Sequence, residues 1–371
     1  MMFPAIELWE SRIFERFSRF KAVWQEINLP SIFSRQRVKN KIMTVGKVLE
    51  IWRYPVKSMG GEKMGACDVS SVGIVGDRGW ALRDEESGEI RGGKKWPGLM
   101  QCCAEYVGAT GTDAALVTSG SIGQDARHGD RALQIPNTII TFPDGSSIRS
   151  DDAHVNERLS EYLGARVSLW PLQPASDKAH YRRRQPGAAV VGVMGKSKTF
   201  RRVLLAIAPY TPLNAQLRGE FSREADEPLP DLSEMPGELF EFATPPGTYF
   251  DAFPIHMLTT SSLDAMRKVN PGAVWDVRRF RPNFLIETTP GIEGFAESEW
   301  AGRRVRIGEM TIACAMPTVR CGMTMHAQRD LPKDPTVLRS IVRDAGQNLG
   351  VYANVGGCGG VRVGDAVELL A

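Results

Sequence analysis

The residues that could bind a metal are the six cysteines and five histidines, and their spacing excludes the common metal sites. The chain has no CxxC pair and no HExxH pair, so zinc sites and histidine-rich metal centres are not expected. Cys321 differs from the other cysteines because Arg320 precedes it directly. A neighbouring cation favours the thiolate form of a cysteine, and soft metals prefer thiolate ligands. Arg320 therefore favours the thiolate form of Cys321, whereas Cys67, Cys102, Cys103 and Cys314 are expected to be buried apolar residues.

Short motifs rich in charged and hydroxyl side chains follow one another along the chain. They are YPVKS at 54–58, GDRGW at 76–80, LTTSS at 258–262, RFRPN at 279–283, PTVRC at 317–321 and GD at 364–365. Each motif alone is a weak signal, but their order is specific. In this order they resemble the MOSC family (molybdenum cofactor sulfurase C-terminal domain) with its N-terminal β-barrel partner domain. The mitochondrial amidoxime-reducing component and its bacterial relatives belong to that family.

The resemblance covers residues 44–172 and 249–370, which is most of the chain. It implies a β-rich α+β fold in which an N-terminal β-barrel-like domain is joined to a MOSC β-barrel domain with a few helices. It also implies a molybdopterin-type molybdenum cofactor and the reduction of N-hydroxylated compounds such as hydroxylamines and amidoximes. The electrons would come from a partner protein. The protein would hold the cofactor and tune it, while the cofactor supplies the redox chemistry.

The resemblance further implies roles for individual residues. Cys321 matches the cysteine that ligates molybdenum, and it is the expected catalytic residue. The phosphate and ring edges of the pterin suit Lys, Arg and hydroxyl groups from both domains. The expected cofactor-binding residues are Lys57, Ser58, Arg78, Thr260, Ser261, Arg281, Asn283, Thr318 and Arg320. Such a pocket would lie at the interface of the two domains.

Three neighbouring residues bear on this site. Thr318 is included because Val319 stands where many relatives have serine, so a hydrogen bond near the metal is lost or supplied by Thr318. Asp77 and Arg279 are left out of the site, because a surface charge or a salt bridge explains each of them equally well.

Two other functions remain open. A carrier or storage protein would bind the same cofactor through Cys321 without turning over a substrate. A scaffold with an empty pocket is a weaker alternative, because Lys57, Arg78, Arg281 and Cys321 are all present. The chain lacks the CxxxxCxxC spacing of a plant-type [2Fe–2S] domain, and neither an iron–sulfur cluster nor a haem is expected. A reductase would therefore need a separate flavin, iron–sulfur or haem protein as its electron donor.

Local signals predict strands at 45–54, 284–288 and 304–307. They also predict a helix that ends at Gly164, one that Ser261 caps and one with Pro335 in its first turn.

The same signals divide the chain into four segments. Residues 1–42 have aromatic side chains near a 3.6-residue period, which predicts an amphipathic helix. Packing on the protein body is the favoured interpretation of this helix. Contact with a membrane surface or a partner is one alternative, and an upstream extension before a natural start at Met43 is another. The other segments are the N-terminal β-barrel domain at 43–172, a linker or insertion at 173–248 and the MOSC domain at 249–371.

The segment 173–248 carries two features of interest. Its residues 221–248 are rich in Glu, Asp and Pro and predict a long loop, which could be a linker, a lid or an insertion. The basic cluster YRRR at 181–184 could dock an acidic redox partner, although a solvated loop is the favoured interpretation.

Composition excludes several classes of protein. The chain has 371 residues and a formal net charge of +3, which gives no reason to expect nucleic-acid binding. It contains no run of ~20 apolar residues of the kind that spans a membrane. A disulfide scaffold is not expected at this size, so the thiols are expected to be free and the location cytoplasmic.

Overall fold

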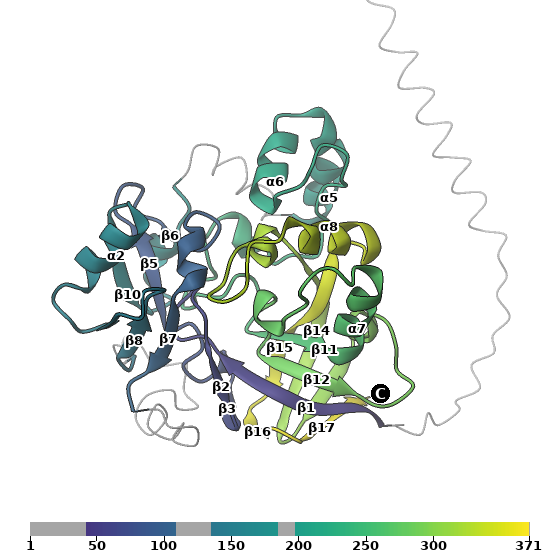
Figure 1. The fold of residues 1–371 in the computed structure, drawn as a ribbon. Helices are drawn as coiled ribbons and strands as arrows, with labels where there is room; N and C mark the ends of the chain where they lie inside the picture. Colours follow the sequence, from purple (N-terminus) through teal and green to yellow (C-terminus); the bar gives the residue numbers. More distant parts are fainter. Residues whose placement is uncertain (1–41, 109–134, 185–196, 371) are drawn as a thin grey trace, which may run out of the picture. The chain divides into compact units, whose positions relative to one another are not determined.

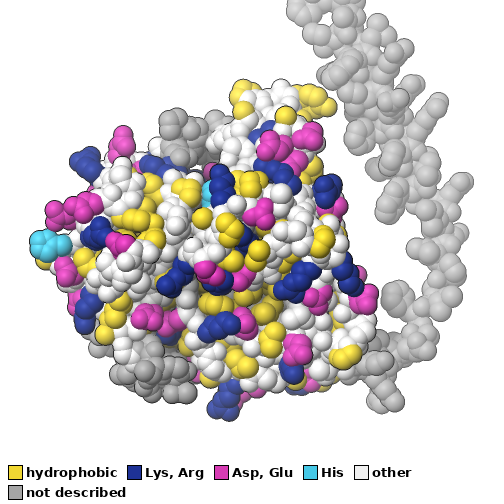
Figure 2. All heavy atoms as spheres, viewed as in Figure 1, with side chains coloured by type: hydrophobic (Ala, Val, Ile, Leu, Met, Phe, Trp, Pro, Cys, Tyr) yellow, Lys and Arg dark blue, Asp and Glu magenta, His cyan; other side chains and the backbone are white. Residues whose placement is uncertain are grey.

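The computed structural model describes residues 42–108, 135–184 and 197–370, which are coloured in Figure 1. The helix expected within residues 1–42 falls outside this range, apart from Ile42. Within the described residues, no helix combines the length and the apolar character that crossing a bilayer requires. The face shown in Figure 2 intersperses Lys and Arg with Asp and Glu, as the near-neutral composition predicts.

A closed β-barrel forms the larger part of the structure (Figure 1). Its strands follow the order β12 (Phe284–Thr288), β11 (Ile255–Thr259), β15 (Asn348–Gly357), β14 (Met310–Val319), β13 (Arg304–Ile307), β17 (Ala366–Leu370) and β1 (Met43–Arg53). β1 pairs with β17 on one side and with β12 on the other, and this second pairing closes the barrel. Alternate side chains of β13 and β14 are buried, so the barrel encloses a packed apolar core.

Strand β1 is expected from its β-branched and aromatic residues, but its pairing is not. It was assigned to the N-terminal domain, yet it supplies one wall of the barrel formed by the C-terminal part of the chain. Gly46 permits this closure, because a Cβ at this position would overlap the carbonyl oxygen of Glu287 on β12. β2 (Glu62–Met64) pairs with the end of β1. β3 (Ala66–Ser70) pairs with β4 (Gly73–Ile74) and with β16 (Gly359–Arg362).

A second body, called here the α2 subdomain, comprises residues 80–106 and 138–171. It contains two three-stranded sheets with the orders β10-β5-β6 and β7-β8-β9. The strands are β5 (Trp80–Asp84), β6 (Ile90–Arg91), β7 (Cys103–Tyr106), β8 (Thr138–Thr141), β9 (Ser147–Arg149) and β10 (Val167–Pro171). Helix α2 (Val155–Leu163) buries Val155 and Leu159 in their shared core and ends at Gly164 in the left-handed conformation.

Helices α7 (Thr260–Val269) and α8 (Pro335–Asp344) pack together beside the barrel through a separate apolar core. α8 begins with Pro335 in its first turn, as its sequence predicts. The expectation that Ser261 caps α7 is wrong. Thr259 is the N-cap residue, because its hydroxyl accepts the backbone N–H of Ser262, and Ser261 lies inside the first turn.

Residues 197–244 form a helical segment, called here the α5–α6 segment, within the stretch 173–248 that was expected to be a linker or insertion. It contains α5 (Lys198–Ile207), α6 (Leu213–Phe221) and the short helix η4 (Gly237–Phe240). Its own small core includes Ala208, Leu217, Leu232 and Phe240, so part of the expected loop is structured. The α+β, β-rich class and the barrel architecture predicted from the sequence are confirmed.

Candidate functional site

Cys321 lies at the floor of a cleft, immediately after β14 ends at Val319. The register between β14 and β15 shifts between Pro317 and Val319, and the backbone then runs extended through Cys321 into the short helix η7 (Gly322–Met325). The Cys321 side chain borders two adjoining hollows. One is lined by Lys57, Ser58 and Lys94, and the other by Arg78, Arg281 and Arg320. The thiol thus faces a space in which several cations stand among apolar residues, with Asp251 as a carboxylate in both hollows.

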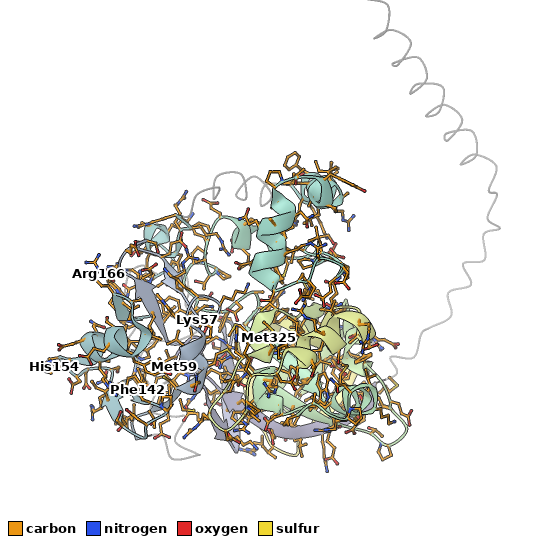
Figure 3. All side chains as sticks on the ribbon, turned by 45° about the horizontal axis from the view of Figure 1, so that its top comes forward. Lys57, Met59, Phe142, His154, Arg166 and Met325 are labelled. Carbon is orange, nitrogen blue, oxygen red and sulfur yellow. The ribbon has the colours of Figure 1, made fainter. Side chains whose placement is uncertain are left out.

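Segment 54–60 carries Lys57 and Ser58 from the barrel into the α2 subdomain. Val56 forms a parallel bridge to Trp80, and Gly60 forms one to Cys103, so this connection is fixed at both ends. Lys57 and Met59 lie between the subdomain side, where Phe142 is labelled, and the barrel side, where Met325 is labelled (Figure 3). The site is therefore built from both parts of the protein.

Arg281 is a buried cation with an unused donor. Its Nη1 donates to the carbonyl of Met59, and its guanidinium lies 4.2 Å from the ring centre of Tyr54. Its Nη2 is buried and has no hydrogen-bond partner among the described residues. Loss of hydration on burial lowers the pKa of Arg281 to about 10, and no carboxylate of the described residues forms an ion pair with it. A buried guanidinium with an unpaired nitrogen beside a cleft is suited to bind an anion.

Arg78 and Arg320 border the same hollow in different ways. Arg78 pairs with Asp77, whose carboxylate also accepts the backbone N–H of Tyr54 and the amide of Asn283. Arg320 donates from Nη2 to the carbonyl of Phe280 at 2.9 Å. Asp77 therefore holds the surrounding backbone in place behind Arg78, instead of lining the hollow itself.

Strained backbone occurs at three of the expected cofactor-binding residues. Ser58, Arg78 and Arg281 have φ values of 70°, 54° and 54°, in the left-handed region that non-glycine residues seldom adopt. Such conformations cost of order 1–3 kcal/mol and persist where the surrounding structure enforces them, commonly at functional sites. These three residues belong to separate segments, and their left-handed backbone conformation directs their side chains toward one cleft.

Lys57 extends from the α2 subdomain side to the segment that precedes β11. Its Nζ donates to Asp251 Oδ1 at 2.5 Å and to the carbonyl of Tyr249 at 3.0 Å. Burial lowers the pKa of Lys57, although Asp251 opposes this. Burial alone would raise the pKa of Asp251, but the nearby cations Lys57, Arg78 and Lys94 hold this pKa well below its usual range. The pair is therefore ionised at neutral pH.

His256 on β11 is neutral and connects two of the arginines. Its Nδ1 lies 3.4 Å from the carbonyl of Arg281, and Arg320 Nη1 lies 3.5 Å from its Nε2. Burial and the adjacent Arg320 guanidinium lower the pKa of His256 well below its ordinary value. This arrangement requires a proton on Nδ1 and a lone pair on Nε2, so His256 acts as a hydrogen-bonding spacer between two positive charges.

Four of the expected site residues do not line either hollow. Thr260 and Ser261 lie in the first turn of α7, where their hydroxyls lie within hydrogen-bonding distance of Thr288 and Thr259. Asn283 bridges the His256 backbone and Asp77. Thr318 is fully buried, and its hydroxyl has no partner among the described residues. Their roles toward the cofactor stay predictions.

Several cleft residues carried no recognised signal in the sequence. Asp251, His256 and Tyr352 border the hollow around Cys321, and Lys94 and Glu220 border the outer part of the cleft. Tyr352 lies on a strand whose pattern indicates core packing, and Glu220 lies on α6, just before the loop expected at 221–248. Arg279, which was left out, borders the inner hollow, but its guanidinium donates to three backbone carbonyls.

The other cysteines lie in different environments. Burial raises the pKa of Cys67, Cys102 and Cys314 to about 12, as expected for thiols in an apolar core. Cys103 was expected to be buried too, but it is half-buried and accepts a hydrogen bond from Arg329. In the described part of the chain, no three His, Cys, Asp or Glu side chains gather as a metal cluster. Any metal at Cys321 would need its remaining ligands from a cofactor or from solvent.

Comparison with known proteins locates two family domains in the chain. The model for the MOSC domain matches residues 245–368, and the model for the MOSC N-terminal beta barrel domain matches residues 45–165. No curated protein sequence matches the chain.

Solved structures give weaker matches. The YUAD protein from Bacillus subtilis is 12% identical, with 90% of this chain and 98% of that chain covered and a TM-score of 0.36. YiiM from Escherichia coli is 16% identical over 32% of this chain and 55% of its own, with a TM-score of 0.26.

Proposed function

Because the chain belongs to the MOSC family with an N-terminal MOSC β-barrel domain, a family associated with molybdenum cofactor binding, we propose that it is a molybdenum-cofactor-dependent reductase of N-hydroxylated compounds. The observation that supports this most directly is the unpaired Nη2 of buried Arg281 beside Cys321. A cationic hollow next to an accessible thiol matches a ligand that has both an anionic end and a metal end.

The residues present fit such a cofactor. Cys321 would hold the metal as a thiolate, since soft sulfur ligands suit molybdenum with a sulfur-rich pterin. Arg281, Arg320 and Arg78 would hold the phosphate and the polar edges of the pterin, and the paired Lys57 would close the opposite side. The buried hydroxyl of Thr318, which lacks a partner among the described residues, would gain one near the metal.

When bound, the cofactor would supply two-electron chemistry, so that R–NHOH, two electrons and two protons give R–NH2 and water. The protein residues position the reactants. Tyr352 and Asp251 border both hollows and so limit how a substrate approaches Cys321. A separate flavin, iron–sulfur or haem protein would return the electrons, because neither domain match includes such a centre.

Metal analysis tests this proposal first. The protein is purified from a host that makes molybdenum cofactor, beside Cys321→Ala and the control Cys103→Ala. The wild type and Cys103→Ala should contain near-stoichiometric molybdenum, and Cys321→Ala should lose it. Absence of molybdenum from all three would contradict the proposal.

An activity assay then separates a reductase from a carrier. Benzamidoxime is incubated with the molybdenum-loaded protein and a chemically reduced dye, and benzamidine is quantified. Conversion that depends on both the dye and Cys321 supports a reductase. Stoichiometric molybdenum without conversion of benzamidoxime or of a hydroxylamine would instead identify a carrier.

A further inference from the structure

An apolar groove leads from the cleft along α6. It is lined by Leu217, Phe221, Leu232, Met235, Leu239 and Phe240, all within the α5–α6 segment. The groove and the cleft over Cys321 share Arg183, Glu220, Phe221 and Met235 in their walls, so they form one continuous space. These groove residues lie between the two family-domain matches, which end at residue 165 and resume at residue 245. The groove is therefore a feature added to the shared domains.

Arg183 stands where the groove meets the cleft. Its Nε donates to the carbonyls of Leu239 and Phe242 at 3.2 and 3.1 Å, which fixes the plane of the guanidinium. Within the described residues, neither of its Nη atoms has a hydrogen-bond acceptor, and no carboxylate pairs with it. Burial lowers the pKa of Arg183, while Glu220 and Glu89 oppose this only partly. Glu220 and Asp251 line the same space, but among the described residues neither forms an ion pair with Arg183, so its two Nη groups stay available as donors.

Neighbouring cations are already neutralised. Lys94 pairs with Glu220 at 2.8 Å, and Arg91 pairs with Glu89 at 2.9 Å. In the basic cluster 181–184, Arg182 pairs with Glu241 at 2.8 Å on the exposed surface. Arg183 is the member of the cluster that borders both the cleft and the groove.

We propose that Arg183 and the groove make the site selective for N-hydroxylated substrates that carry a carboxylate and an apolar body. The carboxylate would bind the Arg183 fork, the apolar body would lie along α6, and the N-hydroxyl group would face Cys321. This inference rests on the proposed reductase function, because it names the substrate class of that function. A planar fork that is held at Nε is preorganised for bidentate binding of a carboxylate.

Binding of octanoate and 1-octanol tests the anion site without any turnover. Both are titrated into the full-length protein by calorimetry, with Arg183→Met and the matched surface variant Arg182→Met. We expect octanoate to bind the wild type more tightly than 1-octanol. Arg183→Met should weaken octanoate binding ~10–100-fold, the effect of losing a charged hydrogen-bond pair, and leave 1-octanol unchanged. Equal octanoate affinity in the wild type and Arg183→Met would overturn the proposal.

A second variant tests whether misfolding is the cause of weaker octanoate binding in Arg183→Met. Glu220 shares the junction with Arg183 and pairs with Lys94, so Glu220→Gln removes a negative charge, leaves Lys94 unpaired and should tighten octanoate binding several-fold. A damaged fold cannot produce tighter binding. Octanoate affinity that stays unchanged or falls in Glu220→Gln would contradict the assigned position of the carboxylate.

Turnover separates failure of this inference from failure of the reductase function. The substrates are 4-(N-hydroxycarbamimidoyl)benzoate and its methyl ester, which differ in the negative charge and in one methyl group. We expect the acid to have the higher kcat/KM, and Arg183→Met to remove this preference through KM. Equal conversion of both substrates by the wild type would support the reductase function and overturn the proposed selectivity for carboxylate substrates. If neither substrate is converted by molybdenum-loaded protein, the reductase proposal fails, and the octanoate titration still decides whether Arg183 forms an anion site.

Discussion

Replacing Arg281 by methionine tests whether this arginine serves ligand binding or the stability of the fold. Burial lowers the pKa of Arg281 from its ordinary value to about 10, and at 1.36 kcal/mol per pKa unit the charged form is disfavoured by about 3 kcal/mol. The variant also loses the hydrogen bond to Met59 and the contact with Tyr54, together worth about 3 kcal/mol. These effects nearly cancel, so the cofactor-free protein should change its free energy of unfolding by less than about 1 kcal/mol.

The same variant should bind the cofactor poorly. Each charged hydrogen bond to a phosphate contributes about 1.5–3 kcal/mol, so losing one or two weakens retention by at least tenfold. The matched control is Arg279→Met. Arg279 is 1% exposed, and its guanidinium donates to the carbonyls of Val274, His326 and Pro332. Without those donors the carbonyls stay buried and unpaired, so this control should lose about 3 kcal/mol of stability.

Urea unfolding of the cofactor-free proteins and molybdenum content after purification measure the two effects. The reasoning predicts that Arg281→Met is stable but poor in molybdenum. If Arg281→Met is as unstable as Arg279→Met and keeps its molybdenum at the wild-type level, the unpaired nitrogen has no role in binding an anion, and the argument is refuted.

Three further predictions concern pH, packing and the core. His256 stays neutral in the folded protein while its unfolded form gains a proton below its ordinary pKa of 6.5, so stability falls as the pH decreases. Between pH 7.5 and 5.5 this effect lowers the free energy of unfolding by about 1.4 kcal/mol, and His256→Gln should remove that part of the pH dependence in urea unfolding. An unchanged pH dependence in His256→Gln would contradict a neutral His256. A Cβ on Gly322 would overlap the hydroxyl of Ser222, so Gly322→Ala should lower the melting temperature. Adding Ser222→Gly should restore most of the loss, and equal melting temperatures of the single and double variants would argue against this contact. Leu159→Ala in α2 removes a fully buried side chain and should cost about 2–5 kcal/mol in chemical unfolding, whereas a loss under 1 kcal/mol would mean that the helix is loosely packed.

Local signals in the sequence predicted individual elements well. Strands β12 and β13 and the end of α2 at Gly164 follow from β-branched runs and a glycine C-cap, because these depend on neighbouring residues alone. The pairing of β1 with β12 and β17 was not foreseen, since it depends on partners hundreds of residues away.

Site residues were predicted where a local motif positions the side chain, and were missed where long-range packing brings the side chain to the cleft. Lys57, Arg78 and Arg281 border the cleft, and their motifs place them at turns with fixed backbone geometry. Asp251 and Tyr352 reach it only through the arrangement of β11, β15 and the segment before them, which no local pattern encodes. The α5–α6 segment was predicted only as part of a linker or insertion at 173–248. Its helices are short and bury their apolar faces mainly against each other, so local sequence did not show how they pack.

Closure of the barrel by β1 has a consequence for protein synthesis. β1 is among the first described strands to leave the ribosome, yet β17 is the last, and neither can pair fully before residue 370 has emerged. Until then β1 exposes unpaired backbone groups and apolar side chains, which are common starting points for aggregation. The cleft also stays incomplete during translation, because Arg281 and Cys321 follow Lys57 by more than two hundred residues. Cofactor insertion would therefore be a late, post-translational event, and slow elongation or chaperone assistance should raise the yield of folded protein.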